Sequence, residues 1–97
     1  MHISITHSLT EKEALTRIKK LITRSKKEYA SMVTNVHESW KENTGTFSFA
    51  VRGYTLSGTI LVKGKEVMLD GELPFTLRFM KGKIERTIRE QARELLR

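Results

Sequence analysis

Within the first forty residues, the period at which hydrophobic side chains recur changes from two residues to about 3.6 residues and back to two. Residues 2–9 alternate between apolar and polar side chains, which is the pattern of a half-buried strand. Residues 11–31 repeat their apolar side chains at helical spacing, and this predicts a helix with one apolar stripe. Thr10 and Glu13 have the spacing of a capping box, so the helix is expected to begin at residue 11. The predicted stripe consists of Ala14, Leu15, Ile18, Leu21, Ile22, Tyr29 and Met32.

Four more strands are predicted between residue 33 and Pro74, because the period returns to two and short polar turns interrupt it. The first turn is assigned to residues 42–45, and turns this short force consecutive strands to run antiparallel. Pro74 has no N–H for a sheet ladder and marks the exit from the last strand. Gly58 falls on the inward side of its strand, where we expect its missing side chain to admit a closely packed helix. The predicted strands span residues 33–41, 46–51, 56–62 and 67–73.

The last segment has the most strongly amphipathic pattern of the chain and predicts a helix that begins near Gly82. A glycine inside a helix costs up to about 1 kcal/mol, which favours a start close to this residue. The apolar side chains fall within an arc of about 80°, and the arginines lie opposite them, where they are expected to be solvated. The apolar arc contains Leu77, Met80, Ile84, Ile88 and Leu95, and the opposite arc contains Arg86, Arg89, Arg93 and Arg97.

The element order β-α-β-β-β-β-α predicts an α+β fold with two layers. An antiparallel sheet would carry both helices on one face, since each helix has a single apolar stripe to bury. At 97 residues the chain is expected to form one domain, residues 1–97. A long last helix held by a curved sheet resembles a small helix-grip domain, which is an analogy of fold and implies no ligand. The aromatic side chains are expected to pack in the core, with a ligand-stacking pocket as the alternative: Trp40, Phe47, Phe49, Phe75 and Phe79.

Composition removes several kinds of chemistry. The chain has no cysteine, which excludes disulfides, thiolate catalysis and cysteine-based zinc sites. His2 and His7 face opposite ways on one strand and cannot clamp a metal together. Nucleophile elbows, phosphate-binding loops and zinc-protease motifs are also missing from the sequence. We therefore expect a protein that is not an enzyme, with no catalytic residue, cofactor or metal.

His7 lies on the apolar side of the first predicted strand. We interpret it as a buried neutral histidine bonded to the backbone, with a catalytic or binding role as the alternative. The first twenty residues lack the basic-then-apolar build of a signal peptide, and no apolar run is long enough to span a membrane. The expected location is the cytoplasm.

Positive charge is concentrated in the two predicted helices. Residues 11–30 and residues 75–97 each carry a net charge of +4, while the rest of the chain nets −1. Such a helical layer suits an anionic lipid surface, an acidic protein or a nucleic acid. The alternative is an ordinary solvated face, and the absence of aromatic residues from the basic faces disfavours base stacking. The candidate partner surface consists of Lys12, Lys19, Lys20, Arg24, Lys27, Arg86, Arg89 and Arg93.

Several short motifs distributed over the whole chain resemble one known family. They are His7-Ser8-Leu9, Trp40, Phe47, Phe49, Ser57-Gly58-Thr59-Ile60, Leu73-Pro74-Phe75 and, most distinctively, Lys81-Gly82-Lys83-Ile84-Glu85. With them the chain is similar to the small bacterial polyhydroxyalkanoic acid system proteins, which are associated with polyhydroxyalkanoate storage granules. Met80 departs from the family pattern, which favours Phe before the Lys-Gly pair. The resemblance implies a partner setting and no reaction.

Three hypotheses for function follow. The first is a non-enzymatic granule-associated or regulatory protein of polyhydroxyalkanoate metabolism, which meets a granule surface, its coat proteins or anionic lipid through the basic helical surface. The second is a small nucleic-acid-binding domain that contacts phosphates without reading sequence. The third is a carrier of an apolar or acyl ligand between the sheet and the last helix, for which the packed aromatic residues are expected to leave little volume.

Overall fold

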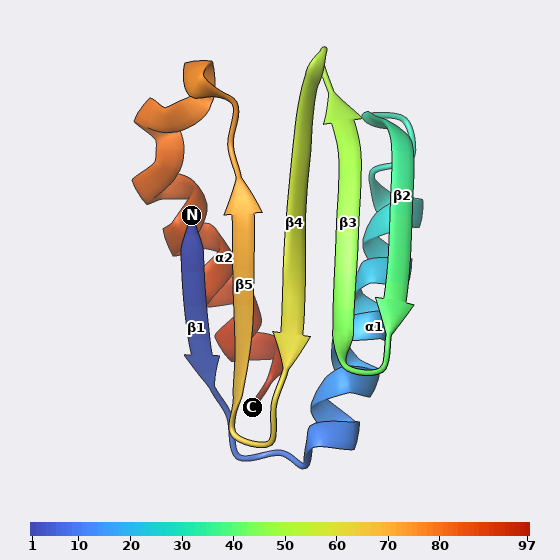
Figure 1. The fold of residues 1–97 in the computed structure, drawn as a ribbon, viewed down its shortest axis with the longest axis vertical. Coiled ribbons are helices and arrows are strands. Elements are labelled where there is room, and N and C mark those ends of the chain that lie inside the picture. The colour runs from blue at the N-terminus through green and yellow to red at the C-terminus, as the bar shows by residue number, and fades with distance from the viewer.

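The computed structural model describes all 97 residues and has the predicted α+β architecture with the predicted element order. Five antiparallel strands form one sheet in the order β1-β5-β4-β3-β2 (Figure 1). The strands are β1 (His2–Thr6), β2 (Val33–Lys41), β3 (Thr44–Val51), β4 (Tyr54–Val62) and β5 (Glu66–Glu72). The helices are α1 (Glu11–Glu28), the 3-10 helix η1 (Phe75–Met80) and α2 (Lys81–Leu95).

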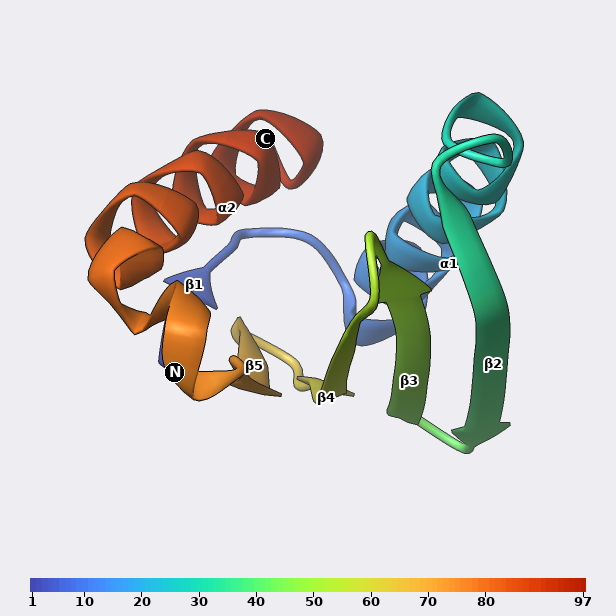
Figure 2. The ribbon, with the colours of Figure 1, turned by 90° about the horizontal axis from the view of Figure 1, so that it is seen from above.

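Both long helices lie on the same face of the sheet, at opposite sides of it. Figure 2 shows α2 above the edge formed by β1 and β5, and α1 beside the half formed by β3 and β2. The helices approach each other where the first half of α1 lies beside the end of α2. There Arg17 of α1 donates hydrogen bonds to the carbonyls of Leu95 (3.1 Å) and Arg97 (2.7 Å). They diverge from there toward the other end of the molecule.

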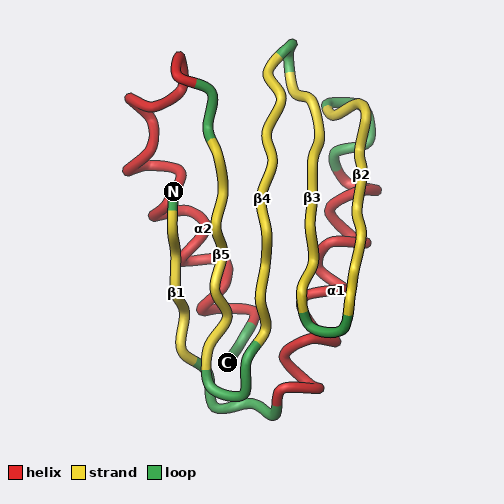
Figure 3. The backbone as a smooth tube through the Cα atoms, viewed as in Figure 1, coloured by secondary structure: helices red, strands yellow, loops and turns green.

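This divergence gives the molecule two different ends (Figures 1 and 3). The closed end comprises the start of α1, the β2–β3 and β4–β5 turns and residues 95–97. The open end comprises η1, the β3–β4 turn and the turn of residues 29–32 that follows α1. The buried hydrophobic residues come from β1, the first half of α1, the adjoining ends of β4 and β5, and the C-terminus. They are Ile3, Ile5, Ala14, Ile18, Val62, Val67 and Leu96.

The predicted N-terminal cap of α1 is confirmed. The Thr10 hydroxyl accepts a hydrogen bond from the Glu13 N–H (3.1 Å), as a capping residue does. The Glu13 carboxylate pairs with Arg17 (2.9 Å) instead of reaching back, so one half of the capping box forms. The predicted end of this helix at residue 31 was wrong, because α1 stops at Glu28. Tyr29 and Met32 lie outside the core and are 50% and 53% exposed. The stripe therefore loses its last two members, because the chain turns away before they reach the sheet.

Two glycines serve close packing in ways that the sequence pattern did not indicate. A Cβ on Gly58 would lie 3.0 Å from the backbone oxygen of Asp70 in β5, and no helix approaches it. The expected helix contact at Gly58 was therefore wrong, and the neighbouring strand is what comes close. A Cβ on Gly45 would lie 2.8 Å from the Trp40 ring, so this glycine makes room for the indole, while the turn itself consists of Glu42 and Asn43.

The aromatic residues divide into a packed group and an exposed group. Trp40 and Phe47 meet edge to face, with ring centroids 5.7 Å apart. Phe75 and Phe79 are 80% and 83% exposed, so their predicted place in the core was wrong. The physical reason is that Pro74 ends the strand region and η1 projects beyond the sheet, where no second layer covers it (Figure 1).

Candidate binding groove and basic helical surface

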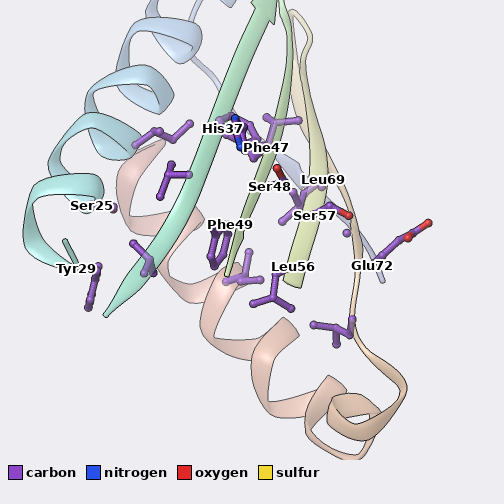
Figure 4. Close-up of a pocket in the computed structure, with 18 of the residues that line it drawn as sticks. Ser25, Tyr29, His37, Phe47, Ser48, Phe49, Leu56, Ser57, Leu69 and Glu72 are labelled. Atoms are coloured by element: carbon purple, nitrogen blue, oxygen red, sulfur yellow. The ribbon is translucent and has the colours of Figure 1, made fainter. Parts of the chain in front are cut away.

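An apolar groove lies between the diverging helices, with the sheet as its floor. Its volume is about 490 Å³, and 14 of the 22 residues that line it are hydrophobic, a lining that suits apolar rather than charged molecules. Figure 4 shows Phe47, Phe49, Leu56 and Leu69 gathered along the strands and Tyr29 at the end of α1. The helical walls are formed by Leu21 and Ile22 of α1 and by Ile84 and Ile88 of α2.

The groove exists because two glycines lie side by side in the sheet below it and because the two helices diverge above it. Gly58 of β4 pairs with Gly71 of β5, so no side chain rises from either strand at that level. Phe47 of β3 pairs with Gly58 from the other side. The expectation that packed aromatic residues would leave little volume was therefore wrong. The volume lies within the range of small-molecule sites, about 300–1,000 Å³.

One carboxylate ties α1 to the sheet beside the groove. Glu38 of β2 accepts a hydrogen bond from the Trp40 indole N–H (2.6 Å) and forms an ion pair with Lys26 of α1. Burial raises the pKa of Glu38, but the hydrogen bonds from Lys26 and Trp40 and the positive charges of Lys26 and Lys19 outweigh it. The pKa of this carboxyl is thereby held below its ordinary value. Lys26, which lines the groove, thus has its charge satisfied within the protein.

The eight residues of the predicted partner surface fall into two separate sets, because their helices lie over opposite halves of the same sheet face (Figure 2). Lys19 is exposed but lies over the Trp40 ring, 5.1 Å from its centroid. Arg89 is half-buried and donates to the Ser4 carbonyl of β1 (3.4 Å), so the expectation that it is solvated was wrong. The other six are exposed on their helices: Lys12, Lys20, Arg24, Lys27, Arg86 and Arg93.

The most distinctive surface was not predicted. All six exposed large hydrophobic residues belong to the open end or to the half of β2 that adjoins it. Within residues 73–84 the chain has three basic residues and no acidic one, and the Arg78 guanidinium lies 5.6 Å from the Phe75 ring centroid. This local charge bias next to Pro74 is visible in the sequence and could have indicated the surface. The six residues are Tyr29, Met32, Val36, Tyr54, Phe75 and Phe79.

His7 has the backbone bonding that was predicted for it, in a half-buried position. Its Nδ1 accepts from the Leu9 N–H (3.1 Å), and its Nε2 donates to the Lys63 carbonyl (3.0 Å). A ring that accepts at one nitrogen and donates at the other is a neutral imidazole. Both nitrogens are occupied in joining the β1–α1 connection to the β4–β5 turn, which is a structural role.

A comparison with known families decides the relationship. A family model described as "Putative polyhydroxyalkanoic acid system protein" matches residues 1–96. The chain belongs to this family. No curated protein and no solved structure matches the chain. Polyhydroxyalkanoic acid system proteins are named for a storage system and not for a reaction, so the groove and the open end have to be interpreted from their own chemistry. No helix in this member is long and apolar enough to cross a membrane.

Proposed function

We propose that the chain is a non-enzymatic protein of the polyhydroxyalkanoate system that associates with the granule surface from the cytoplasm. Its open end faces the granule. The observation that carries this proposal is the placement of every exposed large hydrophobic residue at or beside one end of the molecule. Concentrated apolar side chains on a protein surface mark a site for a protein or lipid partner.

The 3-10 helix η1 has the chemistry of an interfacial anchor. Phe75 and Phe79 project two aromatic rings, and burying a Phe side chain stabilises by about 1.5–3 kcal/mol. Arg78, Lys81 and Lys83 flank the rings. Lys81 lies 4.0 Å from the Glu85 carboxylate, whereas Arg78 and Lys83 form no ion pair. Aromatic insertion combined with basic flanks favours an apolar body with an anionic coat, such as a polyester particle covered by anionic lipid.

The basic helical surface would supply the longer-range attraction. The net charge of +7 draws the protein toward a negative surface, and salt screens this attraction over about 10 Å at 0.1 M. Lys27 in the last turn of α1 and Arg86 in the first half of α2 lie toward the open end. We assign the contact to these residues rather than to Lys12 and Arg93, which lie toward the closed end.

The test is flotation of the protein with polyhydroxybutyrate particles coated with anionic phospholipid. Phe75→Ser/Phe79→Ser is expected to bind at least tenfold more weakly than the parent, while Phe75→Leu/Phe79→Leu stays within about threefold, because leucine retains most of the apolar surface. Circular dichroism checks that both variants are folded. Equal binding by the serine and leucine variants would overturn the role of η1.

The same experiment separates the nucleic-acid hypothesis. A protein that uses its lysines and arginines on phosphates should bind duplex DNA with an affinity that falls steeply with salt. If the parent binds duplex DNA but fails to float with the coated particles, the granule proposal is replaced by the nucleic-acid one.

A further inference from the structure

We infer that the groove is a binding site for a segment of a single uncharged polyester chain, which enters from the open end. This inference rests on the proposed granule association and adds to it a ligand site between α1 and α2. The chemical class of ligand is a linear hydroxyalkanoate chain, apolar along its length and without a charged group.

The apolar walls of the groove argue that it is filled during function. Phe47, Phe49 and Leu56 are only half-buried although they lie in the middle of the sheet, on its helix-covered face. Leaving such side chains in contact with water forgoes about 25 cal/mol for each square ångström of apolar area. A chain lying along the strands would remove that area from water without any movement of the helices.

The charges of the groove select an uncharged chain over a fatty acid. Five lining residues carry titratable groups: Met1 through its N-terminal amine, Lys26, Tyr29, His37 and Glu72. The two amines have partners within the protein, because Lys26 is held in the ion pair with Glu38 and the Met1 ammonium donates to the Gly71 carbonyl (2.9 Å). A carboxylate would therefore meet no free lysine or arginine in the groove. Transfer of an unpaired charge into an apolar site is strongly unfavourable, whereas an ester chain carries no charge to transfer.

The shape of the groove gives the direction of entry. Its lining includes Tyr29 at the end of α1 and Leu73 and Ile84 on either side of η1, so it reaches the open end. At the closed end the buried Leu96 and the hydrogen bonds of Arg17 to residues 95 and 97 bring the helices together. A protein docked with its open end on a polyester surface would thus present the mouth of the groove to chains that protrude from that surface.

The test is calorimetric titration with a short hydroxybutyrate oligomer that is acetylated at its hydroxyl end and methylated at its acid end. Leu56→Trp fills the groove from its floor, and Ile84→Trp fills it from the α2 wall. Leu61→Trp is the matched control, since it makes the same change on the same strand at a position outside the groove lining. The parent and Leu61→Trp are expected to bind alike, and the two filled variants at least tenfold more weakly.

The outcomes distinguish this inference from the proposed function. The filled variants retain Phe75 and Phe79 and should still float with coated particles, so a loss confined to the oligomer supports the groove alone. Absence of oligomer binding by the folded parent overturns the inference, as does equal binding by Leu56→Trp. Tighter binding of decanoate than of the capped oligomer would overturn the uncharged class. A dimer in sedimentation that dissociates on Leu56→Trp would assign the groove to a second copy.

Discussion

The two ends of this molecule are built from the same strands and helices but bury their apolar side chains to different extents. At the closed end the helices meet and cover residues such as Ile3 and Val62, each 1% exposed. At the open end the helices are apart, and Phe75 and Phe79 are more than three-quarters exposed. The sheet runs through both ends, so the angle between the helices causes the difference.

This contrast separates stability from binding. The closed end holds the buried hydrophobic cluster, the cap of α1 and the hydrogen bonds that join the two helices. The open end contributes few buried side chains and can therefore offer its apolar surface to a partner. A small protein of this size has little core to spare, and a proposed binding surface that lies away from that core can be altered separately from it.

The largest expected effect tests that separation directly. Ile3→Ala removes a fully buried side chain and should lower the free energy of unfolding by about 2–5 kcal/mol. Phe75→Ala/Phe79→Ala removes two larger side chains and should change it by no more than about 0.5 kcal/mol. Urea titrations followed by circular dichroism measure both. A double phenylalanine variant as unstable as Ile3→Ala would show that the open end is packed after all.

Two glycines provide a smaller contrast between the ends. Gly45→Ala forces a Cβ against the Trp40 ring and should cost about 1–3 kcal/mol of unfolding free energy. Gly82 lies in the first turn of α2, and the Cβ added by Gly82→Ala would have no atom within 4 Å beyond its chain neighbours and the backbone of its own helix. This substitution should raise the free energy of unfolding by up to about 1 kcal/mol. Thermal unfolding of both variants beside the parent is the measurement. A stabilised Gly45→Ala would mean that the indole is free to move aside.

The elements of both ends could be predicted from the sequence, because their signals are local. Thr10 and Glu13 marked the start of α1 within one turn of the chain, and alternation with short turns gave all five strands. The element order and the side of the sheet that carries the helices followed from one apolar stripe per helix.

The difference between the ends could not be predicted, because it depends on contacts across the whole chain. The helix angle is held by Arg17 and the carbonyls of Leu95 and Arg97, which are 78 and 80 residues away. Periodicity also assumes that every apolar side chain finds a covering layer, and Phe75 and Phe79 have none. The same assumption is why the groove was not predicted. It led to the expectation of a helix packed on Gly58, whereas in the structure Gly58 lines the groove and no helix approaches it.

Charge at the two ends should affect granule binding unequally. Lys27→Gln/Arg86→Gln removes two charges toward the open end, and Lys12→Gln/Arg93→Gln removes two toward the closed end. The longest extent of the molecule is 37 Å, several times the screening length of about 10 Å at 0.1 M salt. A basic residue near an anionic surface contributes about 1 kcal/mol, so the first pair should weaken flotation by roughly ten- to thirtyfold and the second by less than about threefold. Equal losses from the two pairs would mean that the protein does not bind by its open end.

The smallest expected effect concerns Glu38. This carboxylate bonds to Trp40, which packs against the core, and to Lys26, which lines the groove, so it connects the two regions. Its pKa is lowered in the folded protein, so its contribution to stability is present in full above the ordinary glutamate pKa of about 4.3 and is lost as the pH falls through the lowered value. Because Lys26 is partly exposed and solvent screens the pair, Glu38→Gln should lower the free energy of unfolding at pH 7 by less than about 1 kcal/mol. The deficit should shrink as the pH is lowered below 4, since the parent then loses the same interaction. Urea titrations from pH 3 to pH 7 measure this, with Glu90→Gln, an exposed position on α2 outside any ion pair, as the control. A deficit that stays constant across that range would mean that the ionised carboxylate contributes nothing to holding α1 against the sheet.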